Sequence, residues 1–250
     1  MRLYFVALQF LTIVPIPFPR RWQEDELGRS MAFFPLAGLT IGALLAGTDY
    51  LIEPWFPGEV VDVLLIALLS AVTGGLHLDG LADVCDGLAA RGGRERFLAV
   101  MKDPAIGAVG AVGLVIGLLL KYQALSFIPQ EVRREALFCF PMLARYSQVQ
   151  LTVGAQRARS DGLGALFVGG AGPAQLFIAY ALTVSIMYLL LGGAGIVISI
   201  VSYLFTWLAK LWFHRRLGGI TGDVIGCVSE FNEMLCLLAI LVWAGRIYGS

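Results

Sequence analysis

The sequence is poor in charged residues. Only 14% of its 250 residues are Asp, Glu, Lys or Arg, against about 25% in soluble domains. Hydrophobic residues make up 58%, against about 45–50% in soluble domains. Basic and acidic residues cancel to a net charge of zero, so there is no electrostatic basis for nucleic acid as a partner. This composition indicates an integral membrane protein.

Cysteine is also scarce, and long polar connections are missing. Cys85, Cys139, Cys227 and Cys236 lie in apolar surroundings without a C-x-x-C spacing, which argues against a zinc site or a disulfide framework and favours packing roles. The longest connection, about residues 79–104, is too short for a soluble domain. We therefore interpret residues 1–250 as a single integral membrane domain, whose function lies inside the bilayer or at its rim.

Long apolar runs take the place of charge. A spanning helix needs about 20 mainly apolar residues. Seven segments qualify, at roughly 31–52, 61–78, 105–128, 136–153, 173–192, 195–212 and 224–245. The stretch Leu3 to Pro19 is too short before Pro15 and ends in prolines, which favours an interfacial or re-entrant element. The predicted fold is all-α, a polytopic transmembrane helix bundle of about seven spans with broken or re-entrant elements at the cytoplasmic side.

Lysines and arginines fall mainly on one set of alternate loops. Thirteen belong to that set and three to the other: Arg2, Arg20, Arg21, Arg29, Arg91, Arg94, Arg96, Lys102, Arg157, Arg159, Lys210, Arg215 and Arg216 against Arg133, Arg134 and Arg246. Because cytoplasmic loops carry the excess of positive charge, the first set is predicted to be cytoplasmic. Together with the seven predicted spans, this orientation describes a multi-pass protein of the cell membrane.

Acidic side chains follow the second predicted span. In "GGLHLDGLADVCDGLAARGG" Asp79, Asp83 and Asp86 are spaced i, i+4, i+7, which places them within about 60° of one helix face over about 10 Å. They would repel one another, so a counter-charge is expected, either from arginines or from a divalent cation. Carboxylate oxygens suit Mg²⁺ or Mn²⁺. The alternative is an ordinary solvated helix end. His77 lies about 160° from Asp79 on a regular helix and joins this group only if the backbone breaks near Gly80.

Two further polar clusters fall on the same side. In "MKDPAIG" Asp103 is a natural N-cap with Pro104 at the first helical position, and Lys102 beside the helix start suggests an anion site. The alternative for Asp103 is a cap and nothing more. In "TGDVIGCVSEFNE" Asp223 and Glu230 share one face seven residues apart, and Glu230 lies about two turns into the membrane. An acid at that depth is a functional candidate, and the alternative is an acid that serves only helix packing.

One arginine lies well inside a predicted span. Arg145 needs a buried partner, either one of these acids or a bound phosphate. Acids and bases together at the cytoplasmic half of a bundle are what a metal-assisted phosphoryl-transfer site would need.

At these residues the sequence resembles the cobalamin 5′-phosphate synthase family, also called adenosylcobinamide-GDP ribazoletransferase. "GGLHLDGLADVCDGL" matches the family pattern H-x-D-G-x-A-D-x-x-D-G, and "MKDPAIGAVGA" and "TGDVIGCVSE" match two further blocks. "ALQFLTIVPIP" and "MAFFPLAGLTIGAL" give weaker support, so the resemblance runs from Ala7 to Glu233. Pro104 departs from the small hydroxyl residue usual in the family.

The resemblance implies a Mg²⁺-dependent transferase of the bacterial inner membrane. It would join adenosylcobinamide-GDP to α-ribazole or its 5′-phosphate, release GMP and act toward the cytoplasm. On this reading the metal ligands are Asp79, Asp83 and Asp86, the catalytic residues are Asp83, Asp223 and His77, and the substrate-binding residues are Lys102, Asp103, Arg145 and Glu230.

A second class of function is compatible with the same acids. Asp79, Asp83, Asp86, Glu230 and Arg145 would line the path of a transporter or channel for divalent cations or small metabolites. The outer halves of the predicted spans are nearly free of polar residues, apart from Lys121 and scattered serines and threonines, which favours the transferase. Membrane lipid is an expected partner. The preferred acceptor and the formation of a homo-oligomer stay open.

Overall fold

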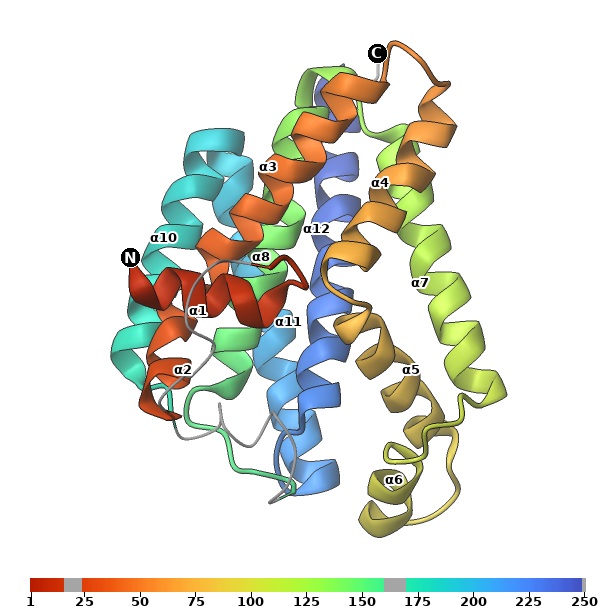
Figure 1. Cartoon of the computed structure of the whole chain (residues 1–250), viewed down its shortest axis with the longest axis vertical. Helices are drawn as coiled ribbons and strands as arrows, with labels where there is room; N and C mark the ends of the chain where they lie inside the picture. Colours follow the sequence, from red (N-terminus) through yellow and green to blue (C-terminus); the bar gives the residue numbers. More distant parts are fainter. Residues whose placement is uncertain (16–23, 160–169, 249–250) are drawn as a thin grey trace.

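The computed structural model describes residues 1–15, 24–159 and 170–248 (Figure 1). In these ranges the only β structure is one isolated parallel bridge between Arg157 and Ile220. The helices are α1 (Arg2–Leu11), α2 (Glu24–Ser30), the 3₁₀ helix η1 (Met31–Phe33), α3 (Phe34–Ile52), α4 (Gly58–Val72), α5 (Leu76–Ala89), α6 (Arg94–Val100), α7 (Ala108–Phe127), α8 (Gln130–Thr152), α10 (Pro173–Leu191), α11 (Gly193–Leu217) and α12 (Gly222–Tyr248).

The bundle is polytopic, as predicted, but the count of seven spans is not confirmed. Five helical stretches within the described ranges are long and apolar enough to cross a membrane: Glu26–Ile52, Ala108–Phe127, Pro173–Leu191, Gly193–Leu217 and Gly222–Ile247. The helices α4 and α5 qualify only together, as one broken unit, which makes six. The fourth predicted segment, 136–153, lies in α8, which carries too many polar residues to meet the same criterion.

The break between α4 and α5 falls earlier in the chain than predicted. The two helices meet at 90°, and Gly74 and Gly75 between them have φ values of 62° and 69°. Glycine adopts this left-handed conformation without the strain that a Cβ would add. Because α5 then runs unbroken through Gly80, His77 stays on the opposite face from Asp79. The condition under which His77 would join the aspartates is not met.

The helix α8 runs through the centre of the bundle. Every residue from Cys139 to Thr152 is buried. On α3, a Cβ at Gly38 would lie 2.5 Å from the Pro141 carbonyl oxygen, and one at Gly42 would lie 2.7 Å from that of Leu137. The Gly-x-x-x-Gly spacing therefore lets α3 and α8 meet main chain to main chain, which is the role such spacings have in membranes.

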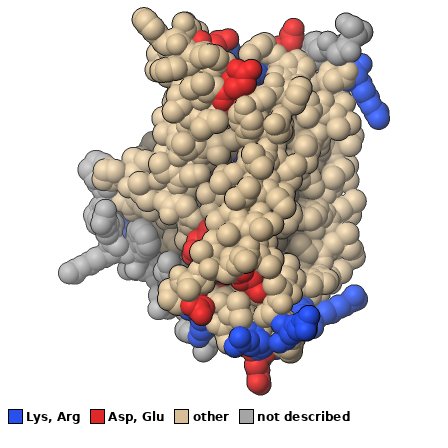
Figure 2. Space-filling view, turned by 90° about the vertical axis from the view of Figure 1, so that its right-hand side faces the viewer, with Lys and Arg blue, Asp and Glu red and all other residues tan. Residues whose placement is uncertain are grey.

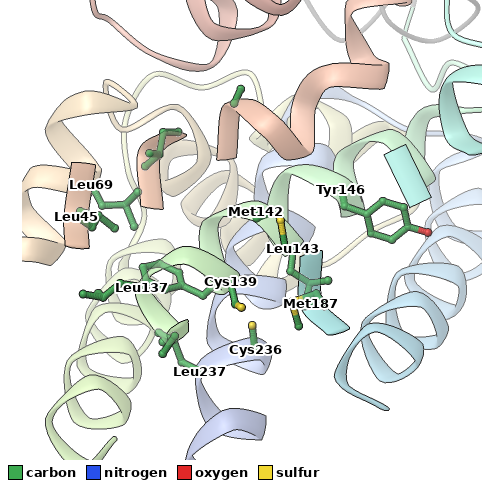
Figure 3. Close-up of a cluster of buried hydrophobic side chains, with 14 of the residues drawn as sticks. Leu45, Leu69, Leu137, Cys139, Met142, Leu143, Tyr146, Met187, Cys236 and Leu237 are labelled. Atoms are coloured by element: carbon green, nitrogen blue, oxygen red, sulfur yellow. The ribbon is translucent and has the colours of Figure 1, made fainter. Parts of the chain in front are cut away.

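Buried apolar side chains fill the space around α8. Figure 3 shows Leu137, Met142 and Leu143 of α8 among Leu45 of α3 and Leu237 of α12. Cys139 and Cys236 lie in the same cluster, and both are free cysteines. The predicted packing role of the cysteines is consistent with these positions.

The two ends of the bundle differ. Figure 1 shows α6, the end of α11 and the start of α12 at one end of the molecule, and the α3–α4 connection and the C-terminus at the other. On the face shown in Figure 2, charged side chains gather toward both ends of the molecule. The broad band between them exposes mainly uncharged residues. We refer to the end with α6, which the sequence predicts to be cytoplasmic, as the inner rim. The short helix α1 crosses α3 (Figure 1), whereas Arg20 and Arg21 lie outside the described residues.

Candidate functional site

Two glycines bring α5 and α12 together. A Cβ at Gly80 would lie 2.6 Å from the Asp223 carbonyl oxygen, and one at Gly226 would lie 3.2 Å from the His77 Cα atom. Real Cβ atoms do not approach a main-chain oxygen so closely, so only glycine fits at position 80. The glycines near Asp79 therefore serve helix packing, and this packing places the acids of α5 beside the start of α12.

Three carboxylates lie together at the inner rim. Asp79 and Asp83 are one turn apart on α5, and Asp223 is in the first turn of α12. The carboxyl group of Asp83 lies within the electrostatic influence of Asp79, Asp223 and Arg159, and Arg159 forms an ion pair with Asp223. We call Asp79, Asp83 and Asp223, together with Arg159, the rim carboxylate cluster. Asp79 is exposed, whereas Asp83 and Asp223 are half-buried.

The start of α12 is held by its own turn. Thr221 Oγ1 accepts a hydrogen bond from the Val224 amide at 3.2 Å and lies 3.3 Å from Asp223 Oδ2. Thr221 therefore caps α12 and orients Asp223, which explains why this short polar motif precedes a long apolar helix.

Asp86, the third predicted metal ligand, has a different role. Its Oδ2 accepts a hydrogen bond from the Gly107 amide at 2.7 Å, and its Oδ1 accepts one from the Gly110 amide at 2.8 Å. These amides belong to the start of α7, where an acidic group is stabilised by the free N–H groups and the helix dipole. Asp86 thus caps α7 from a neighbouring helix, and both of its oxygens are already bonded.

This cap corrects two expectations for residues 101–107. The helix α7 begins at Ala108, not at Pro104, and Asp103 does not cap it. Instead Asp103 Oδ1 accepts a hydrogen bond from the Ala105 amide at 3.0 Å, within a turn. Lys102 is exposed in the same turn. The amides that the sequence assigned to a bound phosphate are occupied by the Asp86 carboxylate.

A second group of charges is buried between α5, α7, α8 and α12. Lys121 Nζ lies 2.6 Å from Glu230 Oε2 and also pairs with Glu233, and Glu233 pairs with Arg145. His77 Nδ1 lies 3.5 Å from Arg145 Nη2. We call these five residues the buried charge network. None of them is more than 4% exposed.

The buried charge network changes how three predicted site residues are understood. Its two cations and two anions balance, as buried charges must. Arg145 and Glu230 therefore have protein partners, and no ligand is needed to explain their burial. His77 Nε2 lies 2.9 Å from Gln148 Nε2. The ring of His77 thus belongs to this network, away from the rim carboxylate cluster.

The carboxylate donors suit Mg²⁺ in kind, although they do not form a complete cage. Within residues 1–15, 24–159 and 170–248 no three His, Cys, Asp or Glu side chains are grouped closely enough to hold an ion by themselves. Mg²⁺ is usually bound through one or two carboxylates together with waters and substrate phosphates. Asp79 and Asp83, with Asp223 beside them, supply donors of this class.

Some important residues were not found from the sequence. Arg159 follows α8 in a connection without a motif, and only the fold brings it to Asp223. At the opposite end from the inner rim, Arg133 Nη2 lies 2.9 Å from Asp49 Oδ1 and 2.6 Å from Asp62 Oδ1. The sequence signal for the ion pairs of Arg133 was Asp62, a lone acid in the apolar run of α4.

Known proteins resemble this chain over nearly its whole length. The family model described as cobalamin-5-phosphate synthase matches residues 3–241. A protein of Geotalea daltonii named adenosylcobinamide-GDP ribazoletransferase is 65% identical over 246 residues, 98% of this chain and 99% of the relative. Proteins of the same name from Pseudomonas savastanoi pv. phaseolicola and Clostridium novyi are 37% and 31% identical, over 95% and 98% of this chain and 98% of each relative.

No solved structure matches the chain. The family match and the identities nevertheless cover both the α5 block and the α12 block, which together build the rim carboxylate cluster. The chain belongs to the cobalamin-5-phosphate synthase family.

Proposed function

We propose that this protein is a membrane-embedded adenosylcobinamide-GDP ribazoletransferase. It joins adenosylcobinamide-GDP to α-ribazole or α-ribazole 5′-phosphate and releases GMP, which yields adenosylcobalamin or its 5′-phosphate. The names of the relatives support the substrates. The structural observation that carries the proposal is the packing of Gly80 against Asp223, which assembles three carboxylates from two distant motifs.

The reaction is a phosphoryl transfer. The 5′-hydroxyl oxygen of the acceptor attacks the phosphorus atom that bears the cobinamide, and the bond from that phosphorus to the oxygen of GMP breaks. The hydroxyl proton passes to a carboxylate, and Asp223 suits this task because it is half-buried beside Asp79 and is not assigned to the metal. Neighbouring negative charge favours the protonated form of a carboxylate.

The diphosphate needs positive charge that the described site supplies only in part. Arg159 pairs with Asp223 at rest, and its guanidinium group is suited to a phosphate oxygen. Mg²⁺, held by Asp79 and Asp83, would neutralise the diphosphate and stabilise the charge that develops on the leaving GMP. Asp86 is left out of this ligand set because both of its oxygens cap α7.

The proposed site faces the cytoplasm of a bacterial cell, at the inner membrane. Within the described residues, the connection before α6, α6 itself and the end of α11 carry Arg91, Arg94, Arg96, Arg215 and Arg216. They lie at the same end of the bundle as the rim carboxylate cluster (Figure 1), and the charge rule assigns this end to the cytoplasm. The transporter alternative loses support because Glu230 and Arg145, two of the residues proposed to line its path, are engaged in ion pairs with Lys121 and Glu233.

The proposal is tested by the release of GMP from purified protein in detergent, given donor and acceptor without a membrane gradient. Turnover should require Mg²⁺, stop on chelation and return when Mg²⁺ is added back. Asp223→Asn should lower turnover by about 10²–10⁴-fold. Glu59→Gln, an exposed acid at the other end of the bundle, is the matched control and should leave turnover unchanged.

The outcomes separate the parts of the proposal. Absence of GMP release from the unaltered protein would overturn the function. Full turnover after thorough chelation would remove Mg²⁺ while leaving the transferase. Full turnover of Asp223→Asn would remove only the role of proton acceptor assigned to that carboxylate.

A further inference from the structure

A groove of about 570 Å³ lies between α5, α11 and α12. Its volume is within the range of ligand pockets, about 300–1,000 Å³. Along α11 the lining extends from Phe205 to Arg215, a separation of ten positions that corresponds to a rise of about 15 Å. This length is half of the roughly 30 Å of a bilayer core. The groove therefore has the depth of one leaflet, with Arg215 at the inner rim and Phe205 toward the membrane centre.

The walls of the groove are apolar and open toward lipid. Leu208, Trp212 and Phe231 line it and are 57%, 43% and 43% exposed, on helices that are long and apolar enough to cross a membrane. The rings of Phe205 and Phe231 pack 6.0 Å apart at the deeper end. Trp212 lies one turn from Arg215, and tryptophan is enriched at the level of lipid headgroups.

The charged end of the groove carries one exposed arginine. Arg215 is the only charged residue among the described lining residues. It takes part in none of the ion pairs found within the described ranges. The next residue, Arg216, points elsewhere, because it donates to the Gly92 carbonyl and lies 5.8 Å from the centre of the Phe97 ring. An apolar groove of leaflet depth thus ends in a single available cation.

We propose that this groove binds one anionic phospholipid of the inner leaflet. An acyl chain lies between α11 and α12, and the headgroup phosphate contacts Arg215. The absence of acidic residues from the described lining and the positive charge at its mouth favour a headgroup with net negative charge over a zwitterionic one. No residue of the rim carboxylate cluster lines the groove, and the inference does not depend on the proposed transferase activity.

The test compares lipid retention by native mass spectrometry after purification from nanodiscs of phosphatidylglycerol or phosphatidylcholine. The unaltered protein should retain phosphatidylglycerol about fivefold better, which corresponds to the roughly 1 kcal/mol of one arginine at a membrane surface. Arg215→Gln should remove this preference. Arg246→Gln, an exposed arginine at the opposite end of the bundle, should keep it.

A second variant tests the apolar part of the groove. Ala209→Trp fills the groove without changing charge and should lower retention of both lipids by severalfold. The helical content of each variant, measured by circular dichroism, shows whether it is folded. Equal retention of the two lipids by the unaltered protein, an unchanged preference in Arg215→Gln, or unchanged retention in folded Ala209→Trp would each overturn the proposal.

Discussion

At the scale of single residues, Glu233 is the acid that neutralises both cations of the buried charge network. Lys121 and Arg145 both pair with it. Removing one partner of a buried ion pair costs about 3–5 kcal/mol, because the remaining charge stays buried. We expect Glu233→Gln to reduce the free energy of unfolding by this order and to lower the melting temperature in detergent. Glu59→Gln, at an exposed position, should change the melting temperature little.

A double variant distinguishes loss of balance from loss of packing. In Lys121→Met with Glu233→Gln, one cation and one anion remain, Arg145 and Glu230. We expect the double variant to be more stable than Glu233→Gln alone, because its buried charges cancel again. A melting temperature lowered by the sum of the two single effects would show that the charges do not act as a network.

At the scale of elements, the start of α7 depends on Asp86. Asp86→Ala removes both acceptors from the Gly107 and Gly110 amides and should destabilise the protein by about 0.5–2 kcal/mol, the usual value of a cap. Asp86→Asn keeps one acceptor and should cost less. Because we assign Mg²⁺ to Asp79 and Asp83, the Mg²⁺ concentration for half-maximal GMP release should stay the same in Asp86→Asn. It should rise in Asp79→Asn.

The contact between α5 and α12 gives a second prediction at this scale. Gly80→Ala would place a Cβ 2.6 Å from the Asp223 carbonyl oxygen, so the start of α12 must move away from α5. We expect turnover to fall by at least tenfold while the protein stays folded. Gly47→Ala is the matched control, since a Cβ there meets nothing within 4 Å. Alanine at that helical position should be neutral or stabilising. Unimpaired turnover in Gly80→Ala would show that this spacing does not matter.

The elements also show what sequence patterns can and cannot predict. Apolar runs located α10, α11 and α12 to within a few residues, because membrane helices need length and low polarity, which are local properties. The start of α7 was misplaced because its cap comes from Asp86, on another helix. His77 was misassigned because the chain breaks at Gly74 and Gly75 instead of near Gly80. The first error has its cause in a tertiary contact, and the second in the position of a local break in the main chain.

The candidate site was predictable to a similar extent. The acids of α5 and α12 stood out because aspartates are rare in such apolar surroundings. Their division between the rim carboxylate cluster and the cap of α7 was not visible in their spacing. Arg159 could not be found at all, because a polar connection without periodicity gives no sign of what it will contact.

At the scale of the whole molecule, orientation is the property to test. In a Cys85→Ser background, Gly93→Cys places a thiol near α6 and Gly58→Cys places one at the start of α4, both where a Cβ meets nothing within 4 Å. We expect a membrane-impermeant maleimide to label Gly58→Cys in intact cells, and Gly93→Cys only after permeabilisation. The reverse pattern would place the rim carboxylate cluster outside the cytoplasm.

The main-chain contact of α5 with α12 bears on how an incoming ligand would be received. Asp79 and Asp223 are held near each other by backbone packing at Gly80, so these two acids need not be brought together by a ligand, and the entropy of assembling them is lost during folding. Like charges are therefore held close together at rest. A cation that relieves their repulsion binds the folded chain alone, and its arrival should make the fold harder to melt.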